Sequence, residues 1–111
     1  MKIAIIGSRS IKNVDVEKYL PKCIDEIISG GAVGVDSIAK AIALQKGIRY
    51  TEFLPKYDLY GRAAPIKRNE EIARYADCAI AFWDGRSKGT HNVIKLFEKI
   101  NKNITIIICS E

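Results

Sequence analysis

The 111-residue sequence has little of what marks extracellular, fibrous or membrane proteins. It contains 3 cysteines, 3 prolines and 8 glycines, so a collagen-like chain or a flexible linker is excluded. No apolar run approaches the roughly 20 residues that a membrane-spanning helix needs. The apolar run at the N-terminus is interrupted at Gly7 and is too short for a signal peptide. We therefore expect a cytoplasmic protein that does not associate with membranes.

The cysteines Cys23, Cys78 and Cys109 are odd in number, and none of them is part of a C-x-x-C motif. Each lies in an apolar stretch, which favours buried thiols in a reducing compartment over a disulfide framework or a zinc site. No set of His, Cys, Asp and Glu has the spacing of metal ligands. We expect no metal and no required cofactor.

The remaining composition is typical of one globular domain, with 48% hydrophobic and 28% charged residues. A chain of this length has room for one core, so we treat residues 1–111 as a single domain. Eighteen Lys and Arg against 13 Asp and Glu give a net charge of +5. This excess favours an anionic partner such as a phosphate, a nucleotide or a nucleic acid, without choosing among them.

Short apolar strands alternate with helical patterns along the chain. We predict strands over residues 3–6, 26–29, 49–53, 78–83 and 104–109. Apolar residues at helical spacing predict helices from Asp15 to about Ile27, from Val35 to Gly47, over residues 70–75 and around residues 93–100. The stretch 56–65 has no period and is predicted to be a loop. This order predicts an α/β protein, a three-layer Rossmann-like parallel sheet of about five strands with helices on both faces.

Three of the predicted strands are followed by loops suited to phosphate binding, at the sheet edge where such folds bind ligands. Glycines allow tight turns and close approach of a ligand, while hydroxyls, a guanidinium and helix N-termini donate hydrogen bonds. Asp84 is placed to accept from a ribose hydroxyl. Neither G-x-G-x-x-G nor G-x-x-x-x-G-K-[ST] occurs, which excludes a standard dinucleotide site or P-loop. The predicted ligand-binding residues of these loops are Gly7, Ser8, Arg9, Gly30, Gly31, Ala32, Asp36, Asp84, Gly85, Ser87, Gly89 and Thr90.

Further candidates lie between the second and third of these loops. Arg62 and Arg68 could pair with a ligand phosphate, and Asn69 follows Arg68 directly. If a helix begins at Arg68, its dipole disfavours a cation there, so this placement calls for a compensating anion. Tyr57 and Tyr60 are candidates to stack on a base.

The order of these motifs is similar to that of one known family. The chain carries Gly7-Ser8-Arg9, then SGGAVGVD over residues 29–36, YGRAAP over 60–65, Arg68-Asn69, and FWDGRSKGT over 82–90. This set closely resembles the YspA-like, YpsA-related branch of the SLOG superfamily, which also contains the DNA-processing protein A and the cytokinin-activating LOG enzymes. The resemblance covers nearly the whole chain. It implies a Rossmann-like fold that binds nucleotides or nucleotide-derived ligands.

The same resemblance bears on catalysis. LOG-type phosphoribohydrolases carry G-G-x-G-T-x-x-E, whose glutamate helps to cleave the N-glycosidic bond. Here Val93 stands at the glutamate position, and Arg86-Ser87 replaces the paired glycines. A valine can neither stabilise an oxocarbenium ion nor position water. We therefore predict ligand binding without LOG-type catalysis.

Three functions follow in order of preference. The first is a sensor or sequestering protein that binds a nucleotide or nucleotide derivative and forms a homo-oligomer. The second is a nucleotide-processing enzyme that uses residues other than the LOG glutamate. The third is single-stranded DNA binding, which ranks last because the chain lacks a long basic segment or a series of aromatic residues.

Overall fold

The computed structural model describes residues 1–31 and 34–109, in which five strands form one parallel sheet. The strands are β1 (Lys2–Gly7), β2 (Glu26–Ser29), β3 (Arg49–Glu52), β4 (Cys78–Trp83) and β5 (Ile104–Ile108). Their order is β3-β2-β1-β4-β5, so the first strand lies in the centre of the sheet. The predicted three-layer α/β Rossmann-like fold is confirmed, and every strand lies within one residue of its predicted ends.

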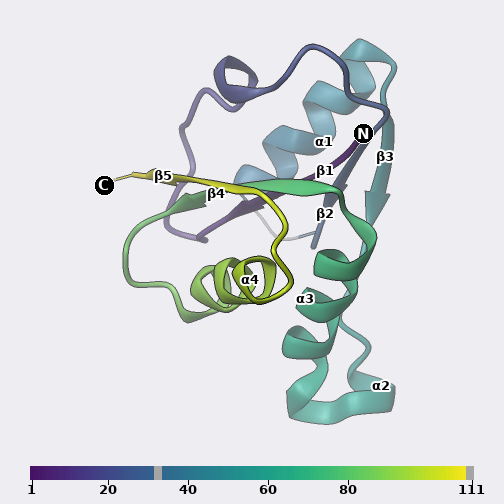
Figure 1. Ribbon diagram of the computed structural model, residues 1–111, viewed down its shortest axis with the longest axis vertical. Coiled ribbons are helices and arrows are strands. Elements are labelled where there is room, and N and C mark those ends of the chain that lie inside the picture. The colour runs from purple at the N-terminus through teal and green to yellow at the C-terminus, as the bar shows by residue number, and fades with distance from the viewer. Residues whose placement is uncertain (32–33, 110–111) are drawn as a thin grey trace.

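Helices cover both faces of this sheet (Figure 1). Helix α1 (Val35–Lys46) packs on one face, and α3 (Ala64–Tyr75) and α4 (Lys88–Lys99) pack on the other. Successive residues of β1 alternate between the two cores: Ile3 and Ile5 face α1, whereas Ala4 and Ile6 face α3 and α4. Central strands buried on both faces account for the continuous apolar runs in the sequence.

The segment between β1 and β2 does not form the predicted helix. It contains only the 3-10 turn η1 (Glu17–Tyr19), with Asp15 accepting the Lys18 N–H at 3.3 Å. Val16 is buried, and Leu20 and Ile24 pack against the same core, from a chain that crosses the face of the sheet. These three residues thus reach the core from an irregular backbone and not from one face of a helix.

This difference also affects the cysteines. Cys23, in the segment without a helix, is exposed, whereas Cys78 and Cys109 are partly buried. The prediction of buried thiols is therefore wrong for Cys23, because no amphipathic helix turns its side chain inward.

Residues 56–65 form helices where the sequence predicts a loop. Helix α2 (Tyr57–Tyr60) and the 3-10 turn η2 (Gly61–Ala63) lead directly into α3, which begins at Ala64 and not near residue 70. Pro65 lies in the first turn of α3, where a missing N–H costs no hydrogen bond. Figure 1 shows α2 projecting away from the sheet, and exposed residues there have no reason to follow an apolar period.

Two of the helices end in defined caps. At the end of α1, Gly47 adopts φ 68° and its N–H donates to the carbonyls of Ala43 and Leu44, as predicted. At the end of α3, the Lys102 ammonium donates to the carbonyls of Ala73, Arg74 and Ala76 at 2.8, 2.8 and 2.7 Å. None of the helices formed by the described residues is both long and apolar enough to span a membrane.

Candidate functional site

A cavity of about 330 Å³ lies at the carboxyl ends of β1, β2 and β4. From β1 the chain builds the sheet outward through β2 and β3 on one side and through β4 and β5 on the other. The cavity therefore lies where the strand order reverses, which is the usual ligand position in open α/β sheets.

Ten of the fifteen predicted ligand-binding residues line this cavity. All three loops reach it, together with α3, although these segments are far apart in the sequence. The loop after β1 contributes Gly7, Ser8 and Arg9, and the loop after β2 contributes Gly30 together with Asp36 of α1. From α3 come Arg68 and Asn69, and from the start of α4 come Ser87, Gly89 and Thr90.

The other five predicted residues do not line the cavity or cannot be placed. Gly31 and Gly85 have positive φ angles of 75° and 81° and shape their turns. Arg62 is exposed on η2, and Asp84 lies in the loop before α4. Ala32 lies outside the described residues.

A side chain at either of two lining glycines would overlap a neighbouring residue. A Cβ atom at Gly7 would overlap the Val35 side chain, at the contact between β1 and α1. A Cβ atom at Gly30 would lie 2.5 Å from Nη1 of Arg68. Packing against Val35 therefore explains Gly7 without any ligand, whereas a side chain at Gly30 would displace the guanidinium of Arg68.

A buried hydroxyl pair connects β1 to α4 at one end of the cavity. Ser8 is 2% exposed, and its Oγ lies 3.2 Å from Oγ1 of Thr90 and accepts the Asp84 N–H at 3.3 Å. Ser87 is the N-cap residue of α4, but its side chain makes no capping hydrogen bond. The N-terminus of α4 thus meets the cavity without a side-chain cap, and its dipole favours an anion there.

Asp84 fixes the shape of the loop before α4. Its carboxylate accepts the N–H groups of Ser87 and Arg86, both at 2.8 Å, and the Ser10 hydroxyl at 2.7 Å. These hydrogen bonds lower the pKa of Asp84 to about 2, and the bond from the Ser87 N–H contributes most to the shift. Because Asp84 does not line the cavity, the predicted ribose contact has no support in this geometry.

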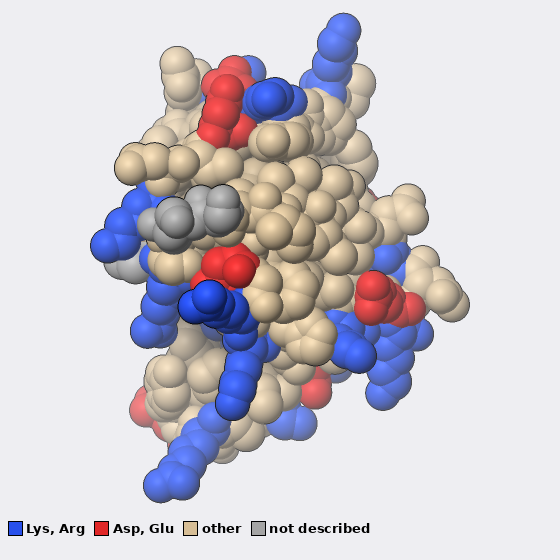
Figure 2. All heavy atoms as spheres, turned by 90° about the vertical axis from the view of Figure 1, so that its left-hand side faces the viewer, with Lys and Arg blue, Asp and Glu red and all other residues tan. Residues whose placement is uncertain are grey.

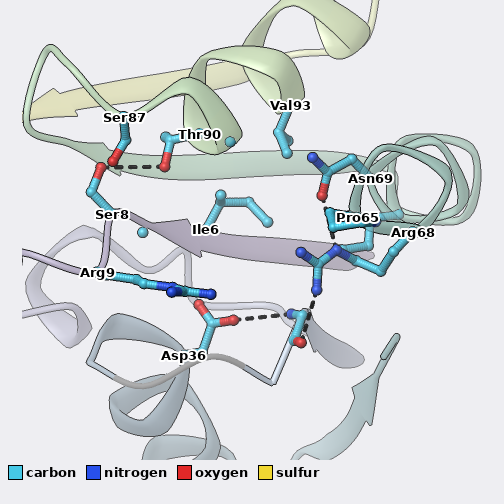
Figure 3. Close-up of a pocket in the computed structure, with 14 residues that line it drawn as sticks. Ile6, Ser8, Arg9, Asp36, Pro65, Arg68, Asn69, Ser87, Thr90 and Val93 are labelled. Carbon is cyan, nitrogen blue, oxygen red and sulfur yellow. Dashed lines mark hydrogen bonds between the residues drawn. The ribbon is translucent and has the colours of Figure 1, made fainter. Parts of the chain in front are cut away.

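Arg68 lies at the other end of the cavity, in the second turn of α3 and not at a helix start. Its Nη1 donates to the carbonyls of Gly30 at 3.0 Å and Phe53 at 3.5 Å, and its Nε donates to Asn69 Oδ1 at 2.9 Å. Burial lowers the pKa of Arg68, an effect that the nearby Asp36 opposes. The guanidinium is therefore oriented by three neutral acceptors, and Figure 3 shows its other terminal nitrogen directed toward the cavity.

Asp36 occupies the first turn of α1 and is 5% exposed. Its Oδ2 accepts the Gly30 N–H at 3.1 Å. A carboxylate of the protein thus lies at the start of α1, the place where the glycine-rich loop predicts a phosphate. The dipole of α1 is already matched by this charge, whereas the carboxylate nearest the start of α4, that of Asp84, accepts the Ser87 N–H and does not line the cavity.

The sequence reasoning did not identify the apolar part of the cavity. Ile6, Pro65, Ile72 and Val93 form this wall. Of these, the sequence analysis singled out Pro65, as part of YGRAAP, and Val93, as the residue at the position of the LOG glutamate, but neither as part of an apolar wall. The wall residues of the sheet and helices carry no local signal, because their patterns are those of any buried face.

An aromatic pair lies beside the start of α4. The rings of Trp83 and His91 stack with centroids 5.3 Å apart and planes 10° apart. The Trp83 indole N–H also donates to the Ser87 carbonyl at 3.1 Å. Tyr57 and Tyr60, the candidates for base stacking, are exposed on α2 and do not line the cavity.

The fold and this cavity define a Rossmann-like α/β protein with a candidate anion-binding site. In comparisons with known proteins, no family model, no curated protein and no solved structure matches the chain. The likeness to the SLOG superfamily therefore rests on the quoted motifs alone. Across residues 1–31 and 34–109, no group of three or more His, Cys, Asp and Glu is placed to hold a metal ion.

Proposed function

We propose that the protein binds a nucleotide or a nucleotide-derived ligand, with a phosphate at the N-terminus of α4. The observation that carries this proposal is the convergence of an uncapped helix start, buried hydroxyls and arginines on one cavity. Helix N-termini bind phosphate through their N–H groups and their dipole. Arg9, in the loop after β1, and Arg68, on α3, supply positive charge to the cavity.

The size and lining of the cavity support a ligand of limited size. Ligand cavities commonly measure about 300–1,000 Å³, so a volume of about 330 Å³ is near the lower end. The apolar wall of Ile6, Ile72 and Val93 offers a surface for an uncharged part of the ligand. This combination favours one mononucleotide unit over a dinucleotide, and no further cofactor is part of the proposal.

The first experiment identifies what the purified protein carries. Mass spectrometry of the small molecules released by heating, followed by thermal shift against linear and cyclic nucleotides, tests the proposal directly. A stoichiometric nucleotide would support it and name the ligand class. A protein that releases no nucleotide, and whose melting no nucleotide changes, would contradict it.

A pair of arginine variants connects binding to the cavity. Arg9→Ala removes a charged donor from the lining, whereas Arg74→Ala removes the same charge from an exposed position of α3 outside it. A charge-assisted hydrogen bond contributes about 1.5–3 kcal/mol, so Arg9→Ala should weaken nucleotide binding about 10-fold or more in calorimetry. Equal affinities of the two variants would show that Arg9 does not take part in nucleotide binding.

Catalysis is the second candidate. Val93 lies in the cavity wall and is 2% exposed, so the position of the LOG glutamate offers no proton donor or acceptor. Turnover of nucleoside monophosphates by the wild type, followed by chromatography, would replace the binding proposal with an enzymatic one. Single-stranded DNA binding, the third candidate, would instead show a steep loss of affinity with added salt.

Further copies of the same chain are proposed as partners. The edge strand β5 exposes Ile106 and Ile108 at 38% and 64%. Figure 2 shows a broad area without charged side chains on the side where the C-terminus and the β4–α4 loop lie. Sedimentation velocity with and without nucleotide tests this, and a monomer under both conditions would contradict it.

A further inference from the structure

The cavity has two polar sides of different chemistry. The hydroxyls of Ser8, Ser87 and Thr90 gather at the start of α4, and Figure 3 shows Asp36 on the opposite side of Ile6 from them. One side therefore offers hydroxyl donors and a helix dipole, whereas the other offers a carboxylate beside the guanidinium groups of Arg9 and Arg68. A ligand that fills the cavity must match both.

Asp36 is the single acidic side chain among the described residues that line the cavity. It is 5% exposed and is held by the Gly30 N–H at 3.1 Å. A carboxylate has about four acceptor positions on its two oxygens. Bonds to protein donors therefore do not prevent it from accepting hydrogen bonds from a ligand as well.

The charge of Asp36 limits what can lie next to it. Two anionic groups in a partly desolvated cavity repel each other strongly, so a phosphate is disfavoured in direct contact with the Asp36 carboxylate. A group that donates hydrogen bonds is favoured instead. In open α/β sheets an acidic residue commonly serves this purpose toward ribose hydroxyls, and Asp36 lines the cavity from the first turn of α1, after the loop that follows β2.

We infer that Asp36 is a specificity-determining residue that accepts hydrogen bonds from the ribose hydroxyls of the ligand. The preferred ligand is then a ribonucleotide with its phosphate at the 5′ end only, over a 2′-deoxyribonucleotide or a nucleotide phosphorylated on the ribose hydroxyls. This inference rests on the proposed function, because it takes the phosphate to lie at α4.

The test uses the wild-type protein and matched ligands, so that it does not depend on the identity of the base. Calorimetry compares each of the four common ribonucleoside 5′-monophosphates with its 2′-deoxy counterpart, and with its 3′,5′-bisphosphate. Loss of a hydrogen bond to a charged group should weaken binding about 10-fold or more. We expect this penalty for the deoxy ligand, and a further loss for the bisphosphate.

Asp36→Asn supplies the second arm of the test. The amide keeps one acceptor oxygen for the Gly30 N–H but removes the negative charge. In this variant the ribose-to-deoxyribose preference should shrink and the bisphosphate should regain affinity, while binding of inorganic phosphate changes little. If the variant does not fold, as judged by thermal unfolding, the wild-type ligand pairs decide the question alone.

The outcomes separate this inference from the proposed function. Equal affinities for the ribo and deoxy ligands, or tighter binding of the bisphosphate, would overturn the role of Asp36 and leave nucleotide binding intact. If none of the monophosphates and no inorganic phosphate bind, the proposed function fails, and the inference fails with it.

Discussion

Substitution of Lys102 is the most direct test of the packing that positions α3, the helix that carries Arg68 and Asn69. Its ammonium donates to three carbonyls at the end of α3, those of Ala73, Arg74 and Ala76, at 2.7–2.8 Å. Lys102→Met keeps an unbranched side chain that is one atom shorter, but it removes all three bonds and the favourable charge at a helix C-terminus.

The expected cost follows from these contacts. A single hydrogen bond to a charged group contributes about 1.5–3 kcal/mol, and a cation at a helix C-terminus about 0.3–1 kcal/mol. The three bonds share one ammonium and are not additive, so we expect Lys102→Met to lower the free energy of unfolding by about 2–3 kcal/mol. For a protein of this size, that corresponds to a fall in Tm of about 10 °C.

Urea and thermal unfolding followed by circular dichroism measure this loss. The matched control is Lys95→Met, because Lys95 is an exposed lysine in the interior of α4. Surface substitutions of this kind change stability by about 0.5 kcal/mol or less. If Lys102→Met costs no more than Lys95→Met, the ammonium does not cap α3, and the reasoning is refuted.

Two further predictions concern the loop before α4. The pKa of Asp84, lowered from 3.8 to about 2 by the donors of the loop, means that its carboxylate stabilises the fold above pH 3.8 and loses this effect as the pH falls toward 2. The stability difference between the wild type and Asp84→Asn in urea unfolding should shrink over that interval, and a constant difference would contradict the loop contacts. Because Trp83 stacks on His91, His91→Ala should make tryptophan emission more accessible to acrylamide quenching, and unchanged quenching would exclude the stack.

The sequence predicts the five strands well because β1, β2 and β4 are short runs whose apolar character directly reflects burial in a parallel sheet. The edge strand β5 is equally apolar in sequence, although Ile106 and Ile108 are exposed. The helix expected after Asp15 fails for a related reason. Val16, Leu20 and Ile24 reach the core one at a time from an irregular chain, and their spacing imitates a helical face. Periodicity reports which residues are buried, but it does not report the backbone path that buries them.

The candidate site, too, could be predicted from the sequence only in part. The three loops after the strands meet because parallel strands end at one edge, and this much can be derived from strand order. Which carboxylate turns into the cavity cannot be derived in that way. Asp84 directly follows a strand and precedes Gly85, and Asp36 follows a strand and a glycine-rich loop. Only the structure shows that the donors of its own loop surround Asp84, whereas Asp36 lines the cavity.

Because of the positions of these two carboxylates, the N-termini of α1 and α4 offer a ligand different chemistry. Asp84 accepts the N–H groups of Arg86 and Ser87, which precede α4, while Thr90 in the first turn of α4 pairs with the hydroxyl of Ser8. Asp36 lies within the first turn of α1 and places its charge at the cavity itself. Because Asp36 already supplies an anion to the dipole of α1 within the cavity, we propose that the phosphate lies at α4 and that the start of α1 is left for a group that donates hydrogen bonds.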